Sequence, residues 1–310
     1  MSAQPKDDRR LARERIAALR AAELHRRRMI TGAVAATTVV VLAVATLVGV
    51  KLADHGSTAA AAKAPAAVQA MTGAAPAALV AQVTGVSPQV LDKVGAGQVS
   101  TLPGTISGAA ALTSGGKPEV VYVGAEYCPY CAAERWPMII ALSRFGTFQN
   151  LQLTHSSSSD VDPNTPTFSF HGATYTSSYL AFSGVETNTN QPAASGNGYG
   201  TLDTPTAAEQ QLLSTYDAPP YVASGSAGAI PFADLGNKFV VSGASYDPGL
   251  LAGKTQQQVA ALLDTPGNPI AQAVDGTANA LTAALCKLTG DQPATVCSSS
   301  GVTAYAGKLG

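Results

Sequence analysis

Two cysteines, Cys128 and Cys131, stand where a predicted strand meets a predicted helix. The apolar run over residues 119–127 predicts a buried strand that ends directly before the first cysteine. Apolar side chains at helical spacing follow, and they predict a helix from Pro129 to about Arg144. A Cys-x-x-Cys motif between a strand and a helix is typical of a redox-active dithiol. This junction limits the chain to folds that bring a strand and a helix together around the pair.

The position of Cys128 predicts which sulfur reacts. The first N–H groups of a helix have no partner inside the helix, and the helix dipole favours a negative charge there. We therefore expect Cys128 to have a lowered thiol pKa and to act as the attacking thiolate, while Cys131 resolves the mixed disulfide. Tyr130 lies between the cysteines, where we expect it to be exposed and to contact the substrate.

Three other interpretations of the pair compete with this one: a structural disulfide, half of a zinc site, or an inert buried pair. A structural zinc site needs four ligands, usually from two such pairs. The only other cysteines are Cys286 and Cys297, which lie far along the chain and are eleven residues apart. The pattern of residues therefore favours redox chemistry and predicts neither a metal site nor a cofactor.

The N-terminal segment predicts the compartment. Residues 1–29 contain nine basic and four acidic residues, and residues 30–50 contain no charged residue. A helix of about 21 residues is about 31 Å long, enough to cross the hydrocarbon core of a bilayer. The basic residues precede this span, and Lys51 is the only one close after it. By the positive-inside rule we expect residues 1–29 in the cytoplasm, a single-pass transmembrane helix at residues 30–50, and an extracytoplasmic remainder at the cell membrane.

A cleaved signal peptide is the alternative, with small residues suited to cleavage at residues 59–67. The apolar run is longer than a usual signal core, which favours an uncleaved anchor. Both alternatives export the same domain to an oxidising compartment. The whole chain carries a net charge of −1 and the leader +5, so the exported part carries about −6 and offers no basic groove for nucleic acid.

The exported part divides into a tether and one domain. Residues 51–78 are rich in Ala, Pro, Gly and Ser and predict a flexible linker, so we expect the folded domain at residues 79–310. Within the domain, Ser87 and Pro88 predict a capped helix that Gly95 ends. Further helices are predicted at residues 205–216, 255–263 and 269–288, strands at residues 120–123, 151–154, 167–170, 175–182 and 238–241, and a polar loop at residues 188–200.

The late cysteines, Cys286 and Cys297, form either a structural disulfide or a second redox relay. Cys286 falls in the last predicted helix and Cys297 in the coil after it, so a bond between them closes a short loop. In an exported protein a structural disulfide is the default, and closing such a loop contributes about 3 kcal/mol. We therefore predict a structural disulfide between them.

The residues around the dithiol resemble those of the thioredoxin superfamily. Residues 125–128, Ala-Glu-Tyr-Cys, are similar to the Ala-Glu-Trp-Cys that precedes the thioredoxin dithiol. Ile230 and Pro231 fall where that fold places a cis-proline beside the active cysteines. The motif Cys-Pro-Tyr-Cys resembles that of glutaredoxins and is close to the Cys-Pro-His-Cys of periplasmic disulfide oxidases. The resemblance implies an α/β, thioredoxin-like fold with an insertion, in which the backbone at Ile230 and Pro231 binds an extended substrate peptide.

A longer run, residues 116–146, is more specific. It resembles a membrane-anchored family of actinobacteria and archaea known as domain of unknown function 929, and the similarity extends over most of residues 80–300. This resemblance implies the thioredoxin-like fold and brings no established substrate. One departure from thioredoxin concerns Tyr122, which stands where thioredoxin keeps a buried Asp as a proton relay. The residue that accepts the proton is therefore not identified by the resemblance.

Together these observations predict a membrane-tethered, extracytoplasmic thiol–disulfide oxidoreductase. Its expected substrates are exported proteins that contain cysteine, and a membrane redox partner is expected to reset the dithiol. Two alternatives stay open. The domain could be a non-catalytic binding module that keeps a thioredoxin-like shell with its dithiol permanently oxidised. A metal carrier using the same pair is the other alternative, although no third ligand stands near the motif.

Overall fold

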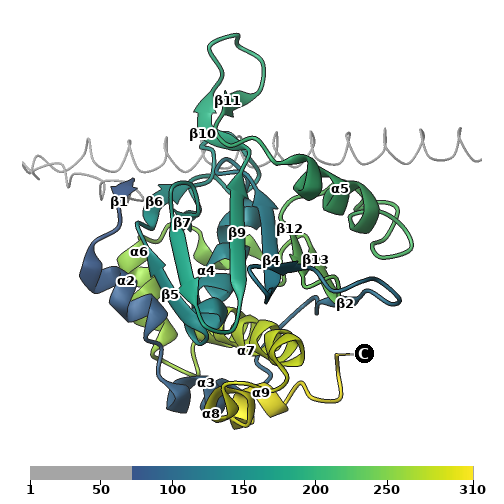
Figure 1. Ribbon diagram of the computed structural model, residues 1–310. Helices are drawn as coiled ribbons and strands as arrows, with labels where there is room; N and C mark the ends of the chain where they lie inside the picture. Colours follow the sequence, from purple (N-terminus) through teal and green to yellow (C-terminus); the bar gives the residue numbers. More distant parts are fainter. Residues whose placement is uncertain (1–71, 310) are drawn as a thin grey trace, which may run out of the picture. The chain divides into compact units, whose positions relative to one another are not determined.

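The computed structural model describes residues 72–309, which form a mixed α/β domain (Figure 1). This confirms the predicted α/β class. The leader at residues 1–29, the predicted transmembrane helix at residues 30–50 and the tether up to residue 71 lie outside the described residues. Among residues 72–309, no helix combines the length and the apolar character that crossing a bilayer requires.

A mixed sheet forms the centre of the domain. Strand β4 lies at its middle, parallel to β9 on one side and antiparallel to β12 on the other, so the chain must cross over between β4 and β9. The short strand β3 turns back onto the start of β4. In spatial order the strands are β2 (Gly104–Thr105), β13 (Phe239–Ser242), β12 (Phe232–Leu235), β4 (Lys117–Gly124) and β9 (Ala181–Glu186), with β3 at Thr113–Ser114.

The two faces of this sheet belong to different cores. Because successive side chains of a strand point to opposite faces, Val120 and Tyr122 enter the larger core, and Val121 and Val123 enter a smaller one. All four side chains are buried. The apolar run that predicts a buried strand is therefore explained by packing on both faces.

Two helices fill the larger core. Helix α4 (Pro129–Ser143) packs against α7 (Pro269–Thr289), and the smaller helices surround this pair. Helix α5 (Ala207–Tyr216) packs against β12 on the other face. The surrounding elements are α2 (Ala77–Thr84), α3 (Pro88–Val94), α6 (Gln256–Leu263), α8 (Ala294–Cys297), α9 (Ser300–Thr303) and the 3-10 turn η1 (Pro248–Leu251).

Three small groups of strands flank the central sheet. One is a three-stranded antiparallel sheet, and the other two are antiparallel pairs, of which β10–β11 extends away from the rest of the domain (Figure 1). The three-stranded sheet contains β1 (Gly73–Ala74), β6 (Gln152–His155) and β7 (Pro166–Ser169), and the pairs are β5 (Gly146–Gln149) with β8 (Thr174–Ser177) and β10 (Asn188–Pro192) with β11 (Tyr199–Thr201).

Local sequence signals place the helix ends well. The Ser87 side chain accepts a hydrogen bond from the N–H of Val90, Pro88 occupies the first turn of α3, and Gly95 follows its end with a φ of 60°. Helices α4, α6 and α7 begin and end within two residues of the predicted bounds. These ends are fixed by capping groups that are adjacent in sequence, which is why the sequence reveals them.

The single strand predicted at residues 175–182 is divided between β8 and β9, and three other predictions about local structure are wrong. Residues 73–78 belong to the folded domain rather than to the tether, because β1 pairs with β6 and α2 begins at Ala77. The predicted polar loop at residues 188–200 contains the β10–β11 hairpin, and Cys297 lies in α8 rather than in coil. In the first two cases a long-range contact orders a segment of weak local preference, as when the N–H of Glu126 donates to the carbonyl oxygen of Asn188 at 2.9 Å.

Candidate functional site

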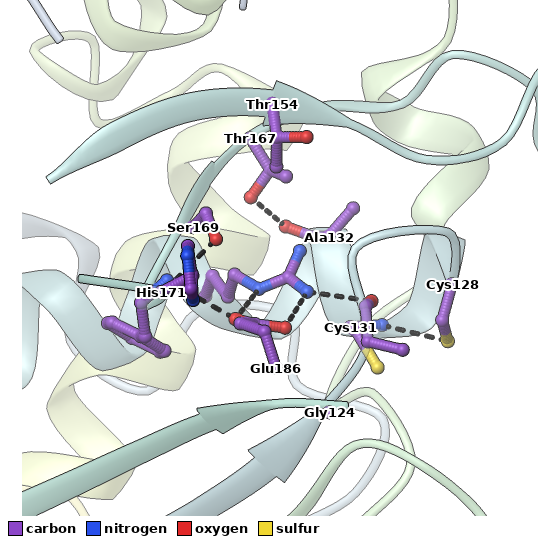
Figure 2. A network of polar contacts seen from close by, with 12 residues as sticks. Gly124, Cys128, Cys131, Ala132, Thr154, Thr167, Ser169, His171 and Glu186 are labelled. Atoms are coloured by element: carbon purple, nitrogen blue, oxygen red, sulfur yellow. Dashed lines mark hydrogen bonds and ion pairs between the residues drawn. The ribbon is translucent and has the colours of Figure 1, made fainter. Parts of the chain in front are cut away.

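Cys128 is the N-cap of α4. Its backbone is extended, with φ −79° and ψ 123°, and its sulfur accepts a hydrogen bond from the N–H of Cys131 at 3.3 Å (Figure 2). Pro129 occupies the first turn, where no N–H is needed. Both thiols are free and buried, with exposed fractions of 6% for Cys128 and 0% for Cys131. The sulfur of Cys128 thus takes the place of the oxygen that usually caps a helix.

The two thiols differ in acidity. The pKa of Cys128 is lowered, chiefly by a hydrogen bond from the Cys131 side chain and, against the effect of burial, by the Cys131 N–H and the charge of Arg135. The pKa of Cys131 is raised well above its ordinary value by complete burial and by its hydrogen bond to Cys128. This arrangement suits a Cys128 thiolate beside a protonated Cys131.

The Ile230–Pro231 segment lies against the dithiol. The Cys128 thiol is 3.7 Å from the carbonyl oxygen of Ile230, in hydrogen-bonding geometry, and the Ile230–Pro231 bond is cis, as the resemblance implied. The carbonyl oxygen of Pro231 accepts the N–H of Gly243, which ties the segment to the end of β13. Two segments about a hundred residues apart in sequence therefore meet at one sulfur.

Tyr130 and two further tyrosines lie around the dithiol. Tyr130 has an exposed fraction of 45%, as the sequence predicted. Tyr127 stacks on Tyr199 of β11, with ring centroids 4.1 Å apart and an interplanar angle of 7°. The carbonyl oxygen of Tyr127 also accepts the N–H of Ser157 at 2.8 Å. The loop before Cys128 is therefore held from two sides, by the hairpin and by the segment after β6.

A buried ion pair, which the sequence analysis did not identify, lies behind the dithiol. Arg135 of α4 donates to Glu186 of β9 through Nε at 2.7 Å and Nη2 at 2.6 Å, and both side chains are fully buried. The same Nη2 donates to the carbonyl oxygen of Ala125 at 2.7 Å. Burial opposes the charged form of Arg135, but Glu186 outweighs it and keeps the pKa of Arg135 above its ordinary value. The available sequence signal is a pair of adjacent charged residues, Glu134 and Arg135, inside an otherwise apolar helix.

Glu186 continues the network towards the surface. Its backbone N–H donates to Asp203 at 3.1 Å, and Asp203 lies 2.7 Å from Nδ1 of His171. The His171 side chain is 45% exposed. Glu186 also accepts the N–H of Phe170 at 3.3 Å. Figure 2 shows Glu186 between His171 and the cysteines; the contacts from His171 and Asp203 reach the backbone N–H of Glu186, and its carboxylate binds Arg135 and the N–H of Phe170.

Tyr122 lies on β4, beside the buried ion pair. Its side chain is fully buried, its hydroxyl has no hydrogen-bond partner among the described residues, and burial raises its pKa well above the ordinary value. The ring lies 6.0 Å from the Arg135 guanidinium. A Cβ atom at position 124 would collide with the Tyr122 hydroxyl, so glycine is needed there. Tyr122 therefore fills space beside the ion pair and is poorly suited to accept a proton.

The other cysteine pair is oxidised. Cys286, in the last turn of α7, and Cys297 of α8 form a disulfide, as the sequence predicted. Among residues 72–309 there is no group of three or more His, Cys, Asp and Glu side chains arranged to hold a metal ion. The described part of the chain therefore contains one free dithiol and one disulfide.

Comparisons with known proteins give one family. The model of a family described as Domain of unknown function (DUF929) matches residues 106–287. No curated protein matches the chain, and no solved structure matches it either. The matched segment contains the dithiol, the ion pair and the Ile230–Pro231 segment. Because the match covers more than half of the 310 residues, the chain belongs to the DUF929 family.

Proposed function

We propose that this protein is a membrane-tethered, extracytoplasmic thiol–disulfide oxidoreductase with a thioredoxin-like fold. The observation that supports this best is the inequality of the two thiols. Cys128 caps a helix, has a lowered pKa and borders the Ile230 carbonyl, whereas Cys131 is fully buried with a raised pKa. A structural pair would gain nothing from this asymmetry. An exchange catalyst needs one thiolate to attack and one thiol held in reserve.

The exchange proceeds in two steps. The Cys128 thiolate attacks one sulfur of a substrate disulfide, forms a mixed disulfide and releases the first substrate thiolate, which takes up a proton. Cys131 then loses its proton and attacks the Cys128 sulfur, which releases the second substrate thiolate. The substrate gains two electrons and the dithiol loses two, becoming the Cys128–Cys131 disulfide. In the opposite direction the enzyme disulfide oxidises a substrate dithiol, and a membrane redox partner restores the starting state.

Protein substrates fit the surroundings of the dithiol. Tyr130 offers an exposed aromatic face between the cysteines, and the Ile230–Pro231 segment places backbone groups beside Cys128. An extended peptide that pairs with the backbone of Ile230 would bring its own cysteine to this sulfur. We therefore propose exported, cysteine-containing proteins as substrates.

The fold and location are proposed on separate grounds. The order β4–α4–β9, with the dithiol at the start of α4 and Ile230–Pro231 leading into β12 beside β4, suits a thioredoxin-like core. The charge pattern of residues 1–29 and the uncharged residues 30–50 support an anchor with a cytoplasmic N-terminus. Protease treatment of intact protoplasts tests this topology, because it should digest the large domain and spare the leader.

Measuring the reduction potential of the Cys128–Cys131 couple tests the function. An exchange catalyst should lie well above about −300 mV, whereas a permanently oxidised binding module should lie below about that value. Cys131→Ser should accumulate mixed disulfides with exported proteins in native membranes, and Cys128→Ser serves as the matched control that traps none. A low potential together with no trapped partner would reject the proposal in favour of the binding module.

A further inference from the structure

The Arg135–Glu186 pair contacts the dithiol loop directly. The carbonyl oxygen of Ala125 accepts two hydrogen bonds, one from Nη2 of Arg135 at 2.7 Å and one from the N–H of Cys128 at 3.3 Å. The guanidinium is therefore one carbonyl group away from the backbone of the reactive cysteine. Arg135 also follows Cys131 by four residues on α4, so the two side chains share one face of the helix.

The guanidinium has little freedom to move. Two parallel hydrogen bonds fix its plane against Glu186, and Glu186 is itself held by the N–H of Phe170 at 3.3 Å. Both side chains are fully buried, so water screens their charges very little. A charge fixed at this place acts on the dithiol in every protonation state of the cysteines.

We infer that Arg135 is a positioning residue for the dithiol, resting on the proposed function: it holds the Ala125 carbonyl, and with it the loop of Cys128, and its permanent positive charge favours the thiolate. Glu186 fixes the guanidinium and limits the size of this effect. The charge of Arg135 lowers the pKa of both cysteines, and Glu186 opposes it at Cys131. The Arg135–Glu186 ion pair thus influences the equilibrium between the dithiol and the disulfide. Tyr122 is neutral and cannot have this electrostatic effect.

Other groups near the dithiol do not supply such a charge. Tyr122 from β4 and Tyr127 from the loop have raised pKa values, chiefly through burial, and stay neutral at pH 7. Glu134, next to Arg135 on α4, is bound to Ser245: its carboxylate accepts the backbone N–H of Ser245 at 2.8 Å and the Ser245 hydroxyl at 3.1 Å. Among the described residues, Arg135 therefore supplies the positive charge that lowers the pKa of both cysteines.

Charge substitutions of opposite sign test this inference. Removing Arg135 alone would leave Glu186 buried without a partner, so the neutral variant is the double substitution Arg135→Met with Glu186→Leu. We expect alkylation of Cys128 at pH 7 to slow about tenfold. The equilibrium with a glutathione buffer should shift about tenfold towards the disulfide, which corresponds to about 30 mV. Glu186→Gln keeps the shape and leaves the positive charge unbalanced, so it should speed alkylation and shift the equilibrium towards the dithiol.

Glu134→Gln is the matched control, because it replaces a buried carboxyl on the same helix that binds Ser245 and not the dithiol loop. It should alter the melting temperature and leave both sulfur measurements unchanged. The inference is overturned if the double variant and Glu186→Gln shift the sulfur measurements in the same direction, or if neither shifts them. If the double variant does not fold, the sign of the Glu186→Gln effect still decides. These measurements need no protein substrate, so absent exchange with exported proteins would reject the proposed function alone.

Discussion

The two cysteine pairs of this domain lie at opposite ends of two packed helices. Cys128 precedes the first turn of α4, where the Cys131 N–H donates to its sulfur. Cys286 lies in the last turn of α7, and its carbonyl oxygen accepts the N–H groups of Gly290 and Asp291. One pair is free and the other is bonded, although both share one domain and one redox compartment is proposed for them.

The helix ends explain much of this difference. The N-terminus of a helix offers free N–H groups and partial positive charge to a thiolate, and the C-terminus offers carbonyl oxygens and partial negative charge. The start of α4 therefore favours a thiolate at Cys128, and the end of α7 offers no comparable stabilisation to a sulfur. The comparison indicates that the position of a cysteine on its helix helps to decide its role: a cysteine at a helix start suits thiol exchange, and one at a helix end suits a structural disulfide.

Removing the reactive sulfur of Cys128 should have the largest effect of all, on the exchange activity that distinguishes the two cysteine pairs. Cys128→Ser leaves only the fully buried thiol of Cys131 at the start of α4, so we expect exchange with glutathione disulfide, measured by mass spectrometry, to be abolished. The double variant Cys286→Ala with Cys297→Ala should keep nearly the wild-type rate. Loss of exchange in the double variant would mean that the late pair is a redox relay, and the division between the two pairs would fail.

The Cys286–Cys297 disulfide should contribute to the free energy of unfolding and not to the exchange activity. Cys286→Ala with Cys297→Ala removes a cross-link between residues eleven apart, and we expect the free energy of unfolding to fall by about 3 kcal/mol. Denaturant unfolding without reductant measures this. Cys128→Ser is the control and should change the unfolding free energy little. Peptide mass mapping that joins either late cysteine to Cys128 or Cys131 would contradict the assignment.

The sequence predicts those features whose causes are local. A capping Ser87, the Pro129 that opens α4 and the close spacing of the cysteines act within a few residues, so the helix ends and both cysteine pairs are visible in the sequence. The α/β class follows in the same way, from alternating runs of strand and helix signals.

The sequence does not reveal features that depend on distant partners. Arg135 and Glu186 are fifty-one residues apart, and nothing near either one predicts that both are fully buried and paired. The β10–β11 hairpin has little local strand preference and is fixed by the stack of Tyr199 on Tyr127. In both cases the fold creates the environment, and the sequence around each residue does not identify its distant partner.

The buried carboxyl of Asp275 on α7 provides a further test of the difference between the α4 and α7 sides of the domain. Asp275 is fully buried, neither of its oxygens has a partner among the described residues, and burial, with a smaller effect of Asp264, raises its pKa to about 8. Between pH 4 and 8 the folded chain keeps a proton that the unfolded chain has lost, so stability should fall as the pH rises through this window. Asp275→Asn cannot ionise, so its stability relative to the wild type should rise as the pH rises towards 8.

Unfolding free energies of both proteins at pH 4, 6 and 8 measure this effect. The difference in unfolding free energy between the wild type and Asp275→Asn should grow with pH. At each pH the substitution should leave the exchange rate of Cys128 unchanged, because α7 contributes stability and not chemistry. A constant difference across the pH range would show that Asp275 does not titrate in this window. A changed exchange rate would instead show that the two sides of the domain are coupled.

The smallest expected effect concerns the exposed side chain between the reactive cysteines. Tyr130 is 45% exposed and can contact a peptide on one face only, so truncating it should remove about 1 kcal/mol of binding. We expect Tyr130→Ala to raise the KM for a cysteine-containing peptide about fivefold, with little change in kcat. Glutathione is too small to depend on this contact, so its exchange rate is the internal control. Equal losses with peptide and glutathione would show that Tyr130 supports the conformation of the dithiol turn, and the substrate surface would then have to lie along Ile230 alone.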